Sequence, residues 1–208
     1  MSEQTRLRIG VLASGRGSNF DVIARAAASG SIPATVAVLV TDRASARALD
    51  IARQHRIEAV CIEPRDHPGR EAHEEQVIAA LEKHAVGLVC LAGYMRILSG
   101  AFVKHFEGRL LNIHPSLLPA FPGLHPQRQA LEYGVRVTGA TVHFVDDGVD
   151  TGPIVVQAAV AIRSDDTEET LAARILPEEH RIYPEAIRLF AEGRLSIEGR
   201  RVRIKETS

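Results

Sequence analysis

The sequence predicts a single α/β domain in which helices cover both faces of a mainly parallel, twisted sheet. Short apolar runs typical of buried strands alternate with segments of about 10 to 15 residues whose apolar positions recur with helical spacing, which indicates βαβ units. The 208 residues, of which 45% are hydrophobic and 25% charged, contain no linker-like or low-complexity segment that would divide the chain.

The first strand and the first helix have the clearest patterns. The apolar run 7–13 predicts a buried strand, which Gly15 and Gly17 end. From Asn19 onward, apolar residues recur at i, i+3, i+4 and i+7 until Gly30, so an amphipathic helix follows. By the same criteria we expect strands at 36–40, 59–62 and 86–91, and helices at 45–55 and 70–84.

The second half of the chain has a looser pattern. Prolines are so frequent between 115 and 123 that neither a helix nor a central strand can continue there. A long helix is expected at 167–193, with Pro177 and Pro184 as breaks or kinks. The other expected elements are short helices at 101–106 and 127–133, strands at 110–114, 137–144 and 154–162, and a terminal hairpin of 195–197 and 202–204.

The charge pattern favours a small-molecule partner. Twenty-five basic and 26 acidic residues give a formal charge of -1, so no overall field attracts a nucleic acid or an anionic membrane. The apolar runs are far shorter than the ~18 residues of a membrane-spanning helix, and the N-terminus lacks a secretory signal pattern. We therefore expect a cytoplasmic protein, as a monomer or a homodimer, that binds neither nucleic acid nor membrane.

No residue pattern indicates a metal site. Cys61 and Cys90 are the only cysteines, and both stand in apolar runs that predict buried strands, with a spacing that matches no zinc motif. The histidines outside the motifs below are scattered over faces that we expect to be exposed, namely His55, His67, His73, His84 and His105. We expect no bound metal.

A glycine-rich turn joins the first strand to the first helix. The segment 14–19 reads SGRGSN, in which two glycines allow a tight turn and either Ser18 or Asn19 can cap the helix. Backbone N–H groups at a helix N-terminus bind anions. Phe20 replaces the third glycine of a dinucleotide fingerprint, and the lysine of a triphosphate-binding loop is missing. A monophosphate site is therefore favoured, and a plain strand-to-helix turn is the alternative.

Asn112 and His114 share one face of the strand expected at 110–114, because residues i and i+2 of a strand point the same way. Pro115 restricts the backbone of His114 to extended conformations. An amide that donates to a developing oxyanion and an imidazole that exchanges protons are typical of an acyl-transfer centre. A hydrogen-bonded structural histidine is the alternative interpretation.

An acidic loop lies between two expected strands. The segment 146–153 reads DDGVDTGP, and its glycines allow it to bend towards a site. We expect Asp150 to hold the His114 imidazole in place and to favour its charged form. A solvated turn rich in Asp and Gly is the alternative.

Four segments together resemble the phosphoribosylglycinamide formyltransferases, a family of folate-dependent enzymes. They are SGRGSN at 14–19, LAGYMRIL at 91–98, LNIHPSLLP at 111–119, and HFV at 143–145 followed by DTGP at 150–153. The segments occur in the order and spacing of the family, and the match runs from about residue 8 to 194. The resemblance implies one Rossmann-like formyltransferase domain over 1–208, with a nucleotide-binding half at about 7–106 and a folate-binding, catalytic half at about 107–208.

The resemblance also implies a reaction and its residues. The formyl group of 10-formyltetrahydrofolate would pass to the amine of glycinamide ribonucleotide in purine synthesis, without a metal. The catalytic set would be Asn112, His114 and Asp150, with Asn112 and a protonated His114 donating to the oxyanion. The ribonucleotide would contact Gly15, Arg16, Gly17, Ser18, Asn19 and Glu179. The folate would contact Arg70, Met95, Arg96, Ile97, Leu98 and Asn112, and the loop Asp146, Asp147, Gly148, Val149 and Asp150.

Other functions fit parts of the pattern. A formyltetrahydrofolate hydrolase or a methionyl-tRNA formyltransferase would use similar catalytic residues, but we expect an extra domain before the first strand or after the last helix in those proteins. A nicotinamide dehydrogenase would use the glycine loop and Asp42, but it needs the missing third glycine. A non-enzymatic nucleotide sensor would not need Asn112, His114 and Asp150 together.

Overall fold

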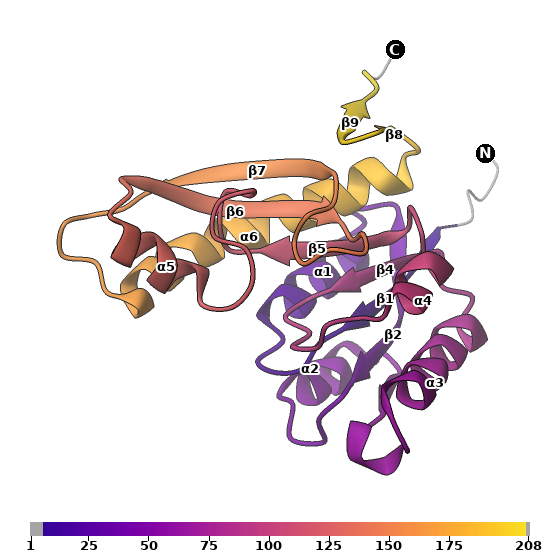
Figure 1. Cartoon of the computed structure of the whole chain (residues 1–208). Coiled ribbons are helices and arrows are strands. Elements are labelled where there is room, and N and C mark those ends of the chain that lie inside the picture. The colour runs from indigo at the N-terminus through magenta and orange to yellow at the C-terminus, as the bar shows by residue number, and fades with distance from the viewer. Residues whose placement is uncertain (1–5, 207–208) are drawn as a thin grey trace.

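The computed structural model describes residues 6–206 and shows an α/β fold with helices on both faces of one sheet (Figure 1). Within that range, nine strands form the sheet in the order β3-β2-β1-β4-β5-β6-β7-β9-β8. The strands are β1 (Leu7–Leu12), β2 (Ala34–Thr41), β3 (Ala59–Cys61), β4 (Leu88–Leu91), β5 (Leu110–His114), β6 (Val137–Phe144), β7 (Ile154–Ala161), β8 (Leu195–Glu198) and β9 (Arg201–Ile204). The helices are α1 (Ser18–Ser29), α2 (Ala48–His55), α3 (Arg70–Lys83), α4 (Gly100–His105), α5 (Pro126–Tyr133) and α6 (Glu168–Ala191), with a 3₁₀ turn, η1, at Pro64–Asp66. The predicted fold class is confirmed.

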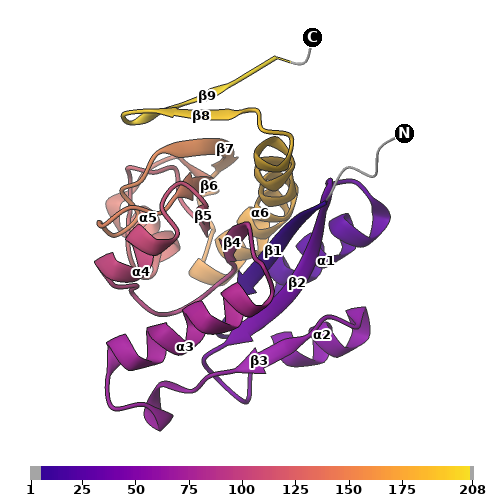
Figure 2. The same ribbon diagram turned by 90° about the vertical axis from the view of Figure 1, so that its right-hand side faces the viewer.

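Alternating apolar side chains place two hydrophobic cores on opposite faces of the sheet. Val11 of β1 packs into the core shared with α1 and α6, whereas Leu12 packs into the core shared with α3 and α4. Figure 2 shows these two pairs of helices on opposite sides of β1 and β4. A Cβ at Gly10 would lie 2.4 Å from Cδ2 of Leu81, so the glycine allows α3 to pack closely against β1.

The direction of the strands changes at β5. Strands β3, β2, β1, β4 and β5 are parallel, whereas β6 is antiparallel to β5 and β7 is antiparallel to β6. Ligands of such sheets bind outside the carboxyl ends of the parallel strands. The fully buried Tyr183 of α6 fixes the helix beneath this edge, because its hydroxyl lies 2.9 Å from the Leu91 carbonyl oxygen and 3.1 Å from that of Leu111.

Helix α6 departs most from the predicted elements, because it continues through Pro177 and Pro184 without a break. An internal proline costs about 3 kcal/mol, whereas full burial of one large apolar side chain contributes roughly 1.5–3 kcal/mol. Helix α6 buries Leu171, Ile175, Ile182, Tyr183, Ala186, Ile187 and Leu189, so burial outweighs both prolines. Within residues 6–206 no helix, including this one, is long and apolar enough to cross a membrane.

The burial of three predicted residues differs from expectation. Cys61 is exposed, not buried, because β3 is the edge strand of the sheet. His73 and His84 are buried, not exposed, and each has a backbone carbonyl beside one ring nitrogen, that of Ile62 at 2.9 Å and that of Ala80 at 2.6 Å. The helical pattern of the sequence therefore did not reveal that these two histidines are buried.

Candidate active site

The glycine-rich loop after β1 and the loop after β4 meet at the carboxyl edge of the sheet. The Ser14 N–H donates to the Gly93 carbonyl at 3.1 Å, and Ser14 Oγ accepts from the Met95 N–H at 2.9 Å. Ser14 is 2% exposed, so water does not compete for these bonds. Strand β5 pairs in parallel with β4, with Asn112 beside Leu91, which brings the predicted motifs to one edge.

The structure brings Asn112, His114 and Asp150 together. Nδ1 of His114 lies 3.3 Å from Oδ2 of Asp150, and Nδ2 of Asn112 lies 3.4 Å from Oδ1 of the same carboxylate. The backbone N–H of Gly123 donates to Asp150 Oδ2 at 2.8 Å. One carboxylate thus touches the amide, the imidazole and the proline-rich loop.

Asp150 reaches the strand because its loop is folded closely onto the end of β6. Its backbone has a φ of 54°, in the left-handed region that residues other than glycine rarely adopt. A Cβ at Gly152 would lie 1.8 Å from the Phe144 carbonyl oxygen, so only glycine allows this approach. Within the loop, Asp146 Oδ1 accepts from the Thr151 hydroxyl at 2.6 Å. These contacts hold Asp150 in place.

His143 joins the cluster, although no role was predicted for it. It lies opposite Asn112 in the β5–β6 pairing, and its Nε2 is 3.2 Å from Asn112 Nδ2 and 3.6 Å from Asp150 Oδ1. Its Nδ1 is 2.8 Å from the Phe144 carbonyl oxygen. Polar residues at alternating positions of an apolar strand, Thr141 and His143, were the signal that could have identified it.

Burial has the largest effect on the pKa of His114. Burial lowers the pKa of this imidazole below 6.5, although Asp150 and the Phe121 carbonyl act in the opposite direction. Burial alone would raise the pKa of Asp150, but His143, the Gly123 N–H and the charge of His114 lower it below its ordinary value. Asp150 contacts the imidazole and favours its charged form, as expected, but burial outweighs this effect on the His114 pKa.

The second ring nitrogen of His114 faces the proline-rich loop. Nε2 lies 2.9 Å from the Phe121 carbonyl oxygen, while Nδ1 faces Asp150. A neutral imidazole has one N–H and donates to only one of these acceptors, whereas an imidazolium donates to both. The surroundings of His114 thus favour uptake of a proton during a reaction.

Gly15 and Gly17 have different structural roles. Gly15 is exposed, and a Cβ there would meet no atom within 4 Å. Gly17 has a φ of 73°, and its Cβ would lie 2.9 Å from the backbone of Ala48. In the described part of the chain no side chain caps α1, so the prediction that Ser18 or Asn19 does so is wrong. The N–H groups of the first turn therefore remain free to bind an anion.

Glu179 of α6 lies beside the glycine loop. Its Oε2 accepts from Asn19 Nδ2 at 2.7 Å. Burial raises the pKa of Glu179, although Asn19 and Arg16 oppose this change. Among the described residues, the buried Oδ1 of Asn19 has no hydrogen-bond partner. A buried carboxyl and an unpaired acceptor are suited to a ligand that carries N–H donors.

A cavity of about 140 Å³ opens beside Asn112. It is lined by 96–98, by the loop 146–150 and by apolar side chains of β4 and α4. An apolar wall opposite a polar loop suits a flat heteroaromatic ring with a polar edge. Of the residues expected here, Arg70 and Met95 do not line the cavity: Arg70 pairs with Glu74, and Met95 is 61% exposed.

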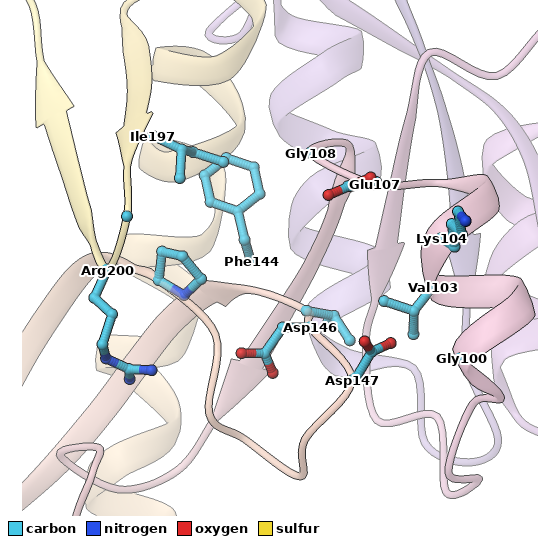
Figure 3. A pocket seen from close by; sticks show the side chains of 13 residues that line it. Gly100, Val103, Lys104, Glu107, Gly108, Phe144, Asp146, Asp147, Ile197 and Arg200 are labelled. Atoms are coloured by element: carbon cyan, nitrogen blue, oxygen red, sulfur yellow. The ribbon is translucent and has the colours of Figure 1, made fainter.

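A larger cavity of about 750 Å³ lies between α4, the loop after β6 and the β8–β9 hairpin. Figure 3 shows Lys104 and Arg200 on opposite sides of it, with Asp146 and Asp147 between them. The cavity contacts neither Asn112 nor His114, so its size does not make it the candidate active site. Within residues 6–206 no group of three or more His, Cys, Asp or Glu side chains is arranged to hold a metal ion.

Comparison with known proteins identifies the family. The sequence model of the formyl transferase family matches residues 7–187 of this chain. The chain belongs to the formyl transferase family. The family predicted from the sequence motifs is therefore confirmed, and the polar cluster on β5 and the cavity beside it lie inside the matched region.

Individual formyl transferases are similar over nearly the whole chain. Phosphoribosylglycinamide formyltransferase of Escherichia coli (strain K12) is 46% identical over 92% of this chain and 90% of that protein. The crystal structure of glycinamide ribonucleotide transformylase 1 from Symbiobacterium toebii has a TM-score of 0.96 and 56% identity, covering 98% of this chain and 96% of that one. The trifunctional purine biosynthetic protein adenosine-3 of Drosophila pseudoobscura pseudoobscura is 46% identical over 94% of this chain, which spans only 14% of that longer protein.

Proposed function

We propose that this formyl transferase carries the formyl group of 10-formyltetrahydrofolate to the amine of glycinamide ribonucleotide in de novo purine biosynthesis. The observation that carries the proposal is the position of Asn112 and Asp150 in the wall of the small cavity. The segment 96–98 of that wall directly follows Met95, whose N–H donates to Ser14 of the glycine loop. A folate in the cavity and a phosphate on the glycine loop would place donor and acceptor at one polar cluster. The names of the relatives support glycinamide ribonucleotide as the acceptor of the formyl group.

The catalytic residues have distinct roles in this proposal. The folate supplies an activated formyl group. Asn112 donates to the formyl oxygen as negative charge develops, a contribution typically worth ~3 kcal/mol. Neutral His114 accepts the proton of the attacking amine and returns it to the leaving nitrogen, and Asp150 stabilises the intervening imidazolium. Access to Nε2 requires the Phe121 carbonyl to move aside.

We assign the folate to the 140 Å³ cavity. Ile97 and Leu98 would contact the flat ring, and the backbone of the loop 146–150 would pair with its polar edge. Arg70 and Met95 would contact the parts of the folate that extend beyond the cavity. The remaining contacts of this proposal are Arg96, Asn112, Asp146, Asp147, Gly148, Val149 and Asp150.

We assign the ribonucleotide to the glycine loop and α6. The uncapped first turn of α1 would bind the phosphate, through the backbone of Gly15, Gly17 and Ser18, with Arg16 as a further cation. Asn19 and Glu179 would bind the glycinamide nitrogens. Because Glu179 belongs to the second half of the chain, the proposed nucleotide half 7–106 and folate half 107–208 would share this substrate. We further propose a cytoplasmic enzyme without nucleic-acid or membrane partners.

The Asp150→Asn variant is expected to show its acidic limb of kcat/KM at lower pH than the wild type. Activity requires neutral His114, so it falls as the pH falls through the His114 pKa, which burial already holds below 6.5. Asp150 raises that pKa, so its neutralisation lowers it further. Steady-state pH profiles of both proteins measure the change, and a limb displaced to higher pH would contradict it.

Gly15→Val is expected to raise KM for the ribonucleotide at least tenfold and to leave KM for the folate within about twofold. The Cβ of the new side chain meets no protein atom within 4 Å, so the substitution is expected to obstruct a ligand on the loop. Gly17→Val is unsuitable for this test, because it clashes with Ala48 and requires a strained backbone. Gly30→Ala is the control for a loss of stability. Gly30 is the C-cap of α1, with a φ of 77° that strains an alanine, and it lies at the end of the helix far from the glycine loop. Equal rises in both KM values would contradict the assignment.

Product analysis tests the proposed reaction itself. Incubation with both substrates is expected to give formylglycinamide ribonucleotide and tetrahydrofolate in equal amounts, measured by chromatography and mass spectrometry. Formate in place of the formylated amine would identify a hydrolase instead.

A further inference from the structure

Glu74 is a buried carboxylate that joins α3 to the start of α4. It is 6% exposed, and its Oε1 accepts from the Ser99 N–H at 2.9 Å and from Arg70 Nε at 3.2 Å. Its Oε2 accepts from the Ser99 hydroxyl. Ser99 is the N-cap of α4, since its Oγ also accepts from the Phe102 N–H at 3.1 Å. This carboxylate therefore fixes both the backbone and the side chain of one residue.

The segment 95–99 is held at its two ends. At the first end the Met95 N–H donates to Ser14 Oγ, and at the second Ser99 donates to Glu74. Between them, 96–98 lines the small cavity. Ile97 is 71% exposed, whereas Leu98 is partly buried against the core that α3 and α4 share. The two anchored ends and the packing of Leu98 together position this wall.

We propose that Glu74 is a positioning residue for the folate, acting through Ser99 on the wall 96–98. Glu74 does not itself line the cavity, so it touches no reacting atom. Without it, the Ser99 N–H and hydroxyl lose their acceptor and Arg70 loses its partner. The end of the wall is then free to move while Ser14 still holds the glycine loop. The inference rests on the proposed function, which places the folate in this cavity.

Glu74→Ala tests the inference through a difference between the two substrates. KM for 10-formyltetrahydrofolate is expected to rise about tenfold, whereas kcat and KM for the ribonucleotide stay within about twofold. Glu74→Gln is expected to recover most of the folate affinity, because its amide oxygen still accepts from the Ser99 N–H. Glu75→Gln is the matched control, since Glu75 is the next residue of α3 and is exposed.

Ser99→Ala keeps the test decisive if Glu74→Ala does not fold. It removes the hydroxyl contact but leaves Glu74 in place, so a smaller rise in the folate KM is expected, and the two changes should not add in the double variant. If Ser99 and Glu74 only stabilised α4, their loss would lower the melting temperature without changing the two KM values differently. Equal rises in both KM values, or an unchanged folate KM in a less stable protein, would overturn the inference.

Binding of tetrahydrofolate, measured by calorimetry, separates this inference from the proposed reaction. If wild-type protein binds tetrahydrofolate but transfers no formyl group, the proposed function fails, and weaker binding by Glu74→Ala still supports the role of Glu74. If the wild type transfers the formyl group and the Glu74 and Ser99 variants bind tetrahydrofolate as the wild type does, the inference alone fails.

Discussion

Replacing His114 and Asp150 by alanine, singly and together, is expected to lower kcat by nearly the same factor, about two to three orders of magnitude. In the proposed mechanism the two residues form one proton-transfer unit: Asp150 faces His114 Nδ1 at 3.3 Å and would stabilise the cation that forms during the reaction. Once either partner is removed, the other has little left to contribute. Steady-state rates of the two single variants and the double variant measure the coupling.

His105→Ala is the control for this series, because His105 lies on α4, away from the cluster, and pairs with Glu82. Its kcat is expected to remain within about twofold of the wild type. Asn112→Ala is expected to cost about two orders of magnitude through the lost oxyanion donor. If the factors by which the two single variants lower kcat simply multiplied in the double variant, His114 and Asp150 would act independently. That result would contradict the proposed proton-transfer unit.

Glycinamide without its ribose phosphate is expected to be a very poor acceptor, with kcat lower by three orders of magnitude or more. In the proposed function, contacts of the phosphate with the glycine loop orient the amine at the formyl carbon, and orientation is worth up to ~7 kcal/mol or more. Binding energy from this remote group is used in the transition state, so its loss lowers kcat as well as affinity. Initial rates over a range of glycinamide concentrations separate the two quantities.

Inorganic phosphate added with glycinamide provides the control for a simple requirement for anion binding. On the proposed assignment it binds the same loop but is not joined to the amine, so it is expected to restore little of kcat. A truncated acceptor with unchanged kcat and a raised KM alone would show that the phosphate serves affinity only, and the orienting role of the loop would then be wrong.

The strand patterns predicted both the fold and the facing of Asn112 and His114, because the period of two in β5 depends only on local geometry. Contacts between residues of separate elements were harder to predict. The contact of His143 with Asn112 depends on the register between β5 and β6, and the lowered pKa of His114 depends on how deeply the ring is buried. Neither quantity appears in the local sequence.

Two further departures have the same physical origin. Pro177 and Pro184 oppose a helix locally, but the burial of one face of α6 outweighs them. Cys61 stands in an apolar run, yet the position of β3 at the edge of the sheet leaves it exposed. In both cases packing between distant elements decided the outcome. The link between Glu74 and Ser99 is likewise visible only in three dimensions.

The rate of 10-formyltetrahydrofolate consumption with and without glycinamide ribonucleotide tests the central claim most directly. Deformylation changes the absorbance of the folate, so one assay follows both conditions. We expect slow turnover of the folate alone and a rate higher by orders of magnitude when the ribonucleotide is present, because water is not held in place by the glycine loop and Glu179. Comparable rates in the two conditions would contradict the proposed transferase and support a hydrolase.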